Sequence, residues 1–224
     1  MKPLICYALT ESVLPRFYKA QEIQKKFPAF DQYDKLVITD FTSKVDTAWP
    51  ILREDIFTAD GIFSLGHAYN VAFWYAAENG YECVLTGDSD RIILNVSEKL
   101  PTQGLSCVDV YHATAKDTVD DMLKNIDTLK YTPSSFFVIP RSVFMKCHFC
   151  EEFVGYAWDD IDYVYNVCPS HGITQPKEFP KLRGLHLYHK ERLFTETSKE
   201  NNRRFKIRNE KIPGTNRCPW AWEK

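Results

Sequence analysis

One stretch in the first half of the chain, residues 61–95, constrains the fold more than any other. Alanines at helical spacing are followed by an Asn-Gly turn signal, the apolar segment Tyr81–Thr86 and two carboxylates, Asp88 and Asp90. A helix followed by a short buried strand is typical of an open α/β sheet, which binds ligands at the carboxyl ends of its strands. Carboxylate oxygens at that edge suit a divalent metal. The stretch therefore predicts a metal site that holds a phosphorylated substrate.

The N-terminal residues predict the start of the same sheet. Leu4–Leu9 is an apolar run suited to a buried strand, Val13–Phe27 has helical spacing, and Lys35–Thr39 is a second short strand that ends at Asp40. Strand, helix and strand in this order open a parallel sheet. Residues 42–60 are expected to be a connection, with a short helix at residues 52–57 as one option.

Composition excludes several classes of protein. A chain of 224 residues, 44% of them hydrophobic, can bury the core of one domain. The formal net charge of −2 gives no general attraction to nucleic acid, so no nucleic-acid partner is expected. No transmembrane segment is expected, because no apolar run approaches the ~20 residues of a span. Residues 1–15 also lack a signal peptide's apolar core, so the seven cysteines indicate reduced thiols in a cytoplasmic protein.

Two motifs in the correct order resemble those of GT-A fold glycosyltransferases. The first runs from Gly66 through Asn70 to Asp88-Ser89-Asp90 and resembles the nucleotide-sugar half, although Tyr69 stands where members commonly have an arginine. The second, Glu151–Asp162, is similar to the acceptor-side motif of galactosyltransferase-type enzymes and follows a predicted strand that ends at Arg141. Together they are far more specific than a lone Asp-x-Asp.

The resemblance implies a GT-A fold, an α/β nucleotide-diphospho-sugar transferase (Rossmann-like) architecture with a mostly parallel central sheet flanked by helices. Residues 1–190 would form one catalytic domain, with a nucleotide-sugar half (1–95) and an acceptor half (96–190). Residues 191–224, rich in lysine and arginine, would form a basic lid or tail. The implied activity is metal-dependent transfer of a hexose-type sugar from a nucleotide-sugar donor, expected to be a UDP-sugar, to a hydroxyl of a glycan or similar acceptor.

Roles follow for particular residues. Asp88 and Asp90 would hold Mn²⁺ or Mg²⁺, and because two carboxylates cannot fill an octahedral shell, His186 and His189 are candidate further ligands, His186 being favoured. By resemblance, Asp160 is the base of an inverting displacement and Asp159 binds the acceptor beside it. The acceptor site would also include Trp158, Asp162 and Arg141. The residues predicted to bind the donor are Thr10, Asp40, Gly66, Asn70, Asp88 and Ser89.

Other interpretations remain open at this point. An Asp-x-Asp often only closes a turn, and an acidic cluster often only favours a helix N-terminus. Cys147-x-x-Cys150 and Cys168-x-x-His171 have the ligand types and spacing of a structural Zn²⁺ site. The alternative functions are therefore a nucleotidyltransferase and a non-enzymatic, zinc-stabilised binding module.

Overall fold

The computed structural model describes residues 3–95, 100, 104–155, 158–173, 177–189 and 196–210. Its centre is one mixed, mostly parallel sheet of eight strands in the order β3-β2-β1-β4-β7-β6-β8-β5. The strands are β1 (Pro3–Leu9), β2 (Asp34–Thr39), β3 (Ile51–Arg53), β4 (Cys83–Gly87), β5 (Arg91–Ile93), β6 (Ser106–His112), β7 (Thr132–Pro140) and β8 (Lys177–His186).

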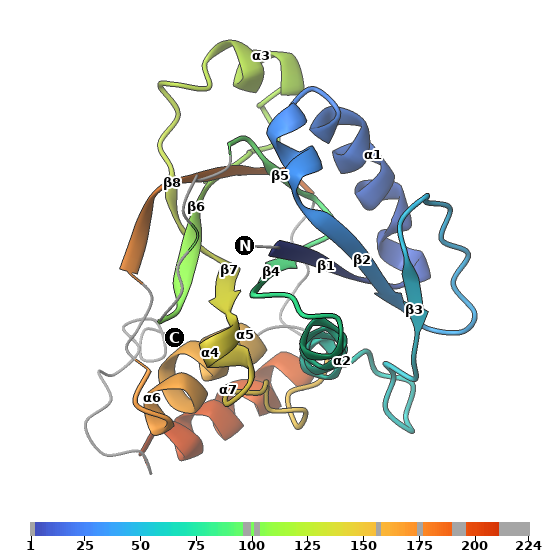
Figure 1. Cartoon of the computed structure of the whole chain (residues 1–224), viewed down its shortest axis with the longest axis vertical. Helices are drawn as coiled ribbons and strands as arrows, with labels where there is room; N and C mark the ends of the chain where they lie inside the picture. The colour runs from blue at the N-terminus through green and yellow to red at the C-terminus, as the bar shows by residue number, and fades with distance from the viewer. Residues whose placement is uncertain are drawn as a thin grey trace.

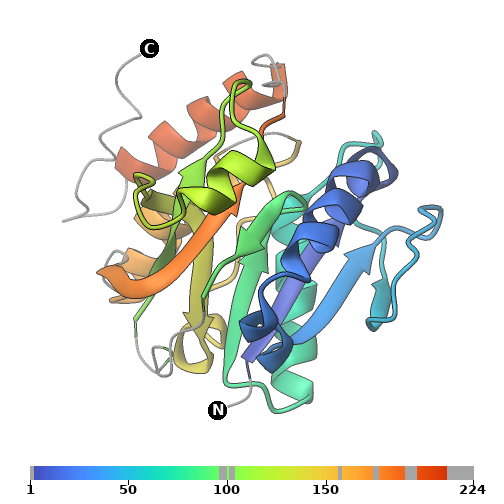
Figure 2. The same ribbon diagram turned by 90° about the horizontal axis from the view of Figure 1, so that it is seen from above.

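Helices and helical turns connect these strands. They are η1 (Glu11–Val13), α1 (Leu14–Gln24), η2 (Pro28–Gln32), α2 (Leu65–Glu78), α3 (Val119–Lys124), α4 (Arg141–Phe144), α5 (Asp159–Asp162), the π-helical η3 (Tyr163–Val167), α6 (Cys168–Ser170) and α7 (Glu196–Glu210). Figures 1 and 2 show α1 and α2 on opposite faces of the part of the sheet built from β1, β2 and β4. Among these described helices, none combines the length and the apolar character needed to cross a membrane.

Strand β1 explains why the first half folds as a layered α/β unit. Its side chains alternate, so that Leu4 and Cys6 pack in the core under α2, whereas Ile5 and Tyr7 pack in the core under α1. All four are essentially inaccessible to water. A strand buried on both faces needs apolar residues at every position, as its sequence has, and parallel pairing with β2 and β4 follows.

The expected option of a helix at residues 52–57 is wrong. Ile51–Arg53 instead forms the edge strand β3, which pairs in parallel with β2, Val37 lying opposite Ile51. A segment this short has no periodicity that separates a strand from a helix. The backbone groups left free at the edge of β2 therefore decide its conformation.

The chain after β8 forms a docked helix, α7, over residues 196–210. Its buried side chains are Ser198, Asn201, Phe205 and Asn209, which recur at helical spacing but are mostly polar. Asn201 donates to the carbonyl of Val154 at 2.9 Å, and fully buried Phe205 packs on Trp158 with 5.4 Å between ring centroids. This part of the predicted lid or tail is thus packed on the acceptor half, and residues 191–195 and 211–224 lie outside the described residues.

Candidate active site

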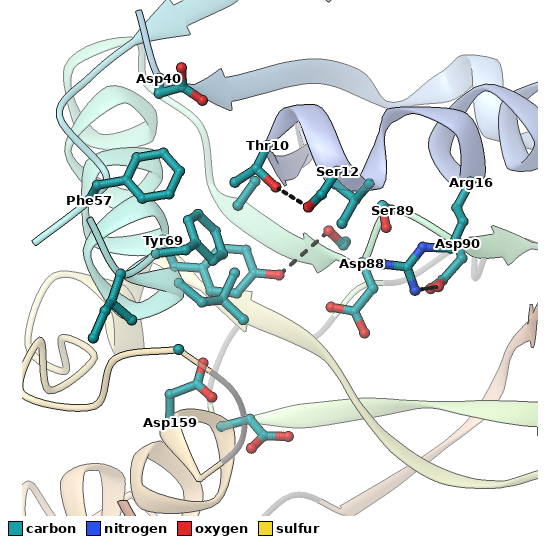
Figure 3. Close-up of a pocket in the computed structure, with 18 of the residues that line it drawn as sticks. Thr10, Ser12, Arg16, Asp40, Phe57, Tyr69, Asp88, Ser89, Asp90 and Asp159 are labelled. Carbon is teal, nitrogen blue, oxygen red and sulfur yellow. Dashed lines mark hydrogen bonds and ion pairs between the residues drawn. The ribbon is translucent and has the colours of Figure 1, made fainter. Parts of the chain in front are cut away.

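A pocket opens at the carboxyl ends of β1, β2 and β4, the edge at which parallel sheets bind ligands. Chain segments that follow these strands line it from one side, and α5 lines it from the other. In Figure 3, Asp88 and Asp159 approach the pocket from these two sides. The two motifs seen in the sequence therefore meet across one cavity.

Asp90, His186 and His189 form a group that can hold a metal ion. Asp90 Oδ1 lies 3.2 Å from His186 Nε2, and Asp90 Oδ2 lies 3.3 Å from His189 Nε2. One ligand atom from each residue lies within 4.8 Å of the other two. A carboxylate oxygen with two imidazole nitrogens fits Mn²⁺ better than Mg²⁺, which prefers oxygen ligands. Among the residues that the structure describes, no other metal-binding group is found.

The electrostatics of Asp90 are those of a buried anion surrounded by nitrogen ligands. Burial alone would raise the pKa of this carboxyl, but His186, His189 and Arg16 together lower it below its ordinary value. Arg16 Nη1 lies 3.2 Å from Asp90 Oδ2. Asp90 is thus held ionised, the state required of a metal ligand.

Both histidines reach Asp90 because β8 ends between them. In a continuous strand, residues three apart point to opposite faces. Strand β8 stops at His186, however, and the next amide, that of Leu187, donates to the carbonyl of Asp90 at 3.0 Å. Residues 187–189 have no regular secondary structure, and the imidazole of His189 lies beside that of His186, with 5.2 Å between ring centroids.

Asp88 has a different partner from Asp90. Its carboxylate forms an ion pair with Arg91, whose side chain is buried. Asp88 lines the pocket but does not belong to the Asp90 group, so its role as a metal ligand stays a prediction. Arg16 and Arg91, two cations in the pocket lining, were missed from the sequence. In the sequence, only the position of Arg91 next to Asp90 indicated that it belongs to the site.

Tyr69 occupies the position at which the resembled proteins commonly have arginine. Its hydroxyl reaches the carbonyl of Gly87 at 3.5 Å, and its ring packs against Phe149. Burial raises the pKa of this phenol well above its usual value, and nearby Asp88 raises it further. Tyr69 therefore lies in the pocket as a neutral group, and the arginines that line the pocket are Arg16 and Arg91.

Besides Asp88, three predicted donor-binding residues line the pocket: Thr10, Asp40 and Ser89. The Asp40 carboxylate already accepts hydrogen bonds from the backbone amides of Thr42 and Ser43, at 2.7 and 2.8 Å, and from both hydroxyls. Although burial would raise its pKa, these bonds lower the pKa of Asp40 to about 2. The Asp40 carboxylate therefore closes the turn after β2.

Gly66 and Asn70, also predicted to bind the donor, do not line the pocket. The amide group of Asn70 instead donates to the carbonyl of Phe149 at 2.9 Å and accepts from its N–H at 2.8 Å. A side chain at Gly66 would come within 3.3 Å of the Cys150 carbonyl oxygen. Both residues thus hold the loop before the acceptor motif against α2.

The acidic cluster enters the pocket from α5. Trp158, in the left-handed conformation at φ 81°, Asp159 and Asp160 all line the pocket. Asp159 is only 7% exposed, and its Oδ2 has no hydrogen-bond partner among the described residues. Burial, and then the charges of Asp160 and Asp88, raise the pKa of Asp159 well above its ordinary value. Burial thus disfavours the ionised form of Asp159, which lies beside the more accessible Asp160.

Asp162, predicted to belong to the acceptor site, lies behind the pocket. It is fully buried and accepts from Asn166 at 2.6 Å and from Arg208 of α7 at 2.9 Å. Asp162 does not line the pocket, so its contacts connect the acidic helix to the C-terminal helix.

Arg141, also predicted to belong to the acceptor site, lies away from the pocket. Strand β7 runs antiparallel to β4, with Pro140 opposite Cys83, so Arg141 lies beside the start of β4. The pocket lies at the other end of that strand. Arg141 donates to the carbonyls of Ala77 and Tyr81 at 3.1–3.3 Å and caps the end of α2.

The predicted zinc site does not form. Cys147 and Cys168 lie side by side in the core under α2, with their thiols hydrogen-bonded to each other. Cys150 instead packs near Phe153 and Trp158, in a separate cluster. His171 does not join the thiols, and the metal-binding group found in the described part of the chain contains no cysteine. The described residues therefore give no cysteine cluster for the zinc of a zinc-stabilised binding module.

Solved structures show which class of fold contains this pocket. A mutant Drosophila β1,4-galactosyltransferase 7 in complex with manganese, UDP-Gal and xylobiose matches 89% of this chain and 79% of its own, with a TM-score of 0.56 at 12% identity. S. aureus TarS in complex with UDP-GlcNAc matches 95% of this chain and 68% of its own, with a TM-score of 0.57 at 13% identity. The chain thus has the GT-A glycosyltransferase fold, as predicted.

No protein-family profile and no curated protein sequence matches the chain. The likeness is therefore one of fold. The particular reaction must be argued from the residues of the pocket.

Proposed function

We propose that this protein is a metal-dependent glycosyltransferase that transfers a sugar from a UDP-sugar to a hydroxyl of a glycan-type acceptor. The observation that carries the proposal is the pocket itself, in which the Asp90–His186–His189 group and the acidic pair Asp159–Asp160 share one cavity. The structural matches that contain manganese with UDP-Gal, or UDP-GlcNAc, support the choice of donor.

On the donor side, Asp90, His186 and His189 would hold the ion. Asp88 would be available as a further ligand at the ion's open coordination positions. A bound divalent ion would supply Lewis-acid neutralisation of the charge that develops on the departing diphosphate. Arg16 and Arg91 line the same part of the pocket and would add positive charge there. Tyr69 and Phe57 would provide apolar surface for the nucleoside.

On the acceptor side, the two neighbouring carboxyls would take opposite roles. Because burial raises the pKa of Asp159, this carboxyl would keep its proton and would donate a hydrogen bond from its O–H to an acceptor oxygen. Asp160, which is more exposed, would remove the proton from the attacking hydroxyl. One base opposite a leaving group suits a single displacement with inversion of the sugar carbon.

The experiment is a thermal-shift titration with UDP in the presence and absence of Mn²⁺. At a ligand concentration of 100 Kd, the wild-type protein should gain about 2.7 kcal/mol of stability. For a domain of this size that gain is roughly 5–10 °C. Asp90→Ala should abolish the Mn²⁺-dependent part of the shift, whereas Asp120→Ala, a control on exposed α3, should keep it.

Donor turnover then tests the reaction itself. A panel of nucleotide sugars should show slow Mn²⁺-dependent hydrolysis of at least one UDP-sugar by the wild-type protein. The proposal fails if neither UDP nor any nucleotide sugar binds with Mn²⁺, or if Asp90→Ala behaves as the wild type does.

A further inference from the structure

A third histidine, His112, lies directly behind the candidate metal group. It is the last residue of β6, and parallel pairing with β8 places it opposite His186. The Nδ1 atoms of the two rings are 3.0 Å apart, and the rings meet edge to face with centroids separated by 5.0 Å. His112 does not belong to the Asp90 group and does not line the pocket.

This contact leaves the imidazole of His186 held at both ring nitrogens. Its Nε2 faces Asp90 at 3.2 Å, and its Nδ1 faces His112. A ring held at both ends cannot turn about its χ2 torsion without losing one partner. Partners behind a metal-binding histidine fix its orientation and its tautomer, and their loss typically weakens metal binding 10- to 100-fold.

We propose that His112 is a positioning residue that orients His186 for metal binding through the Nδ1–Nδ1 hydrogen bond. This inference rests on the proposed function only in requiring that the Asp90 group bind a divalent ion.

Proton placement shows why an imidazole suits this position. When neutral His186 donates from Nε2 to Asp90, its Nδ1 carries only a lone pair, so His112 must donate from Nδ1. When the Nε2 lone pair of His186 instead binds a metal, the proton must sit on Nδ1 and be donated to His112. His112 accepts it by carrying its own proton on Nε2. An imidazole can serve in either direction, and so can an asparagine amide after a flip.

The side chain of His112 can be replaced without disturbing the backbone around it. The amide of Ala113 donates to the carbonyl of His186 at 3.0 Å, and this bond does not involve the side chain of His112. His112 is also exposed, so its replacement opens no cavity in the core. A substitution should therefore change the orientation of His186 and leave the pairing of β6 with β8 intact.

The test measures Mn²⁺ affinity directly, by isothermal titration calorimetry in the absence of nucleotide. His112→Phe keeps a ring of similar size without a polar atom and should weaken Mn²⁺ binding about 10- to 100-fold. His112→Asn places an amide near the position of Nδ1 and should restore the affinity to within about threefold of the wild type. His148→Phe, which removes another exposed histidine, should leave the affinity unchanged.

A double-mutant cycle separates positioning from a general structural effect. In a His186→Ala background, His112→Phe should cause no further loss of Mn²⁺ affinity, because the residue acts through His186. The melting temperatures of the metal-free variants should coincide. The inference is overturned if His112→Phe binds Mn²⁺ as the wild type does, if His112→Asn does not rescue, or if the loss persists without His186.

The outcomes also separate this inference from the proposed function. Wild-type protein that binds Mn²⁺, with an unchanged His112→Phe variant, overturns the positioning role alone. Wild-type protein that binds no Mn²⁺ overturns the metal site and, with it, any role for His112 there.

Discussion

Replacement of Phe205 by alanine should release the C-terminal helix α7 from the acceptor half. Phe205 is fully buried against Trp158 and Phe153, and Phe→Ala at such a position costs about 3–5 kcal/mol. The other buried side chains of α7 are polar, so Phe205 supplies most of its apolar contact. We therefore expect the free energy of unfolding to fall by about 3 kcal/mol or more. This loss cannot exceed the free energy with which α7 docks on the acceptor half.

Urea denaturation measures the loss in the free energy of unfolding, and limited proteolysis measures the release of α7. Ile207→Ala is the matched control, because Ile207 lies on the same helix but is 39% exposed; it should cost about 0.5 kcal/mol or less. Only the Phe205 variant should become sensitive to cleavage within residues 196–210. The reasoning is refuted if the two variants lose the same stability, or if α7 resists protease in both.

The same variant tests the link between α7 and the acidic helix. Arg208 of α7 pairs with buried Asp162, three residues after Asp159 at the start of the acidic cluster. Release of α7 leaves Asp162 without that charge partner. Acceptor KM should then rise while the affinity for UDP with Mn²⁺ stays unchanged, because the donor residues lie on other elements.

Four further predictions concern single residues. Asp160→Asn should lower turnover about 10²- to 10⁴-fold, as removal of a base does, whereas Asp159→Asn should cost far less because burial raises the pKa of that carboxyl and disfavours its ionised form. Asp40 has a folded-state pKa of about 2, below the ordinary 3.8, so the stability it contributes is complete above about pH 4 and is lost as the pH falls toward 2. Asp40→Asn should remove about 2 kcal/mol of that acid dependence, measured by urea denaturation across pH. Arg141→Met should lower stability by about 1–3 kcal/mol, since it uncaps α2, without changing acceptor KM. Gly184→Ala would place a Cβ 2.9 Å from the Ile92 carbonyl oxygen; it should cost about 1–3 kcal/mol and weaken Mn²⁺ binding by moving β8.

Three of these predictions have a specific outcome that would contradict them. Equal losses of turnover in the Asp159 and Asp160 variants would mean that the two carboxyls act as one unit. If Asp40→Asn left the acid-denaturation curve unchanged, the fold would stabilise the ionised Asp40 carboxylate no better than water does. A raised acceptor KM in Arg141→Met would return that arginine to the acceptor site.

Much of the donor half could be predicted from the sequence because its signals are local. The apolar run of β1 is continuous because both its faces are buried. The alanines of α2 recur at helical spacing because that helix lies on the sheet. Asp88 and Asp90 directly follow β4, so a short segment placed them at the edge of the sheet. The GT-A fold predicted from these signals and the acceptor motif is confirmed by the matches to solved structures.

The errors arose where long-range pairing decides the outcome. Arg141 follows a strand, as predicted. Because β7 runs antiparallel to β4, however, Arg141 lies at the end of the sheet away from the pocket. The cysteines have zinc-site spacing, yet Cys150 and Cys147 pack in different cores. The polar buried face of α7 carries no apolar signal that would distinguish it from a solvated helix.

The sequence by itself therefore determined the strand and helix order of the donor half and the carboxylates at its edge, because backbone propensity and side-chain periodicity act within a few residues. Only the tertiary structure decided which distant groups join Asp90. His186 and His189 reach it because β8 ends at His186, where the Leu187 amide bonds the carbonyl of Asp90, and Arg16 reaches it from α1. Such a site is assembled by hydrogen bonds between strands that are far apart in the chain, and no local pattern encodes that contact.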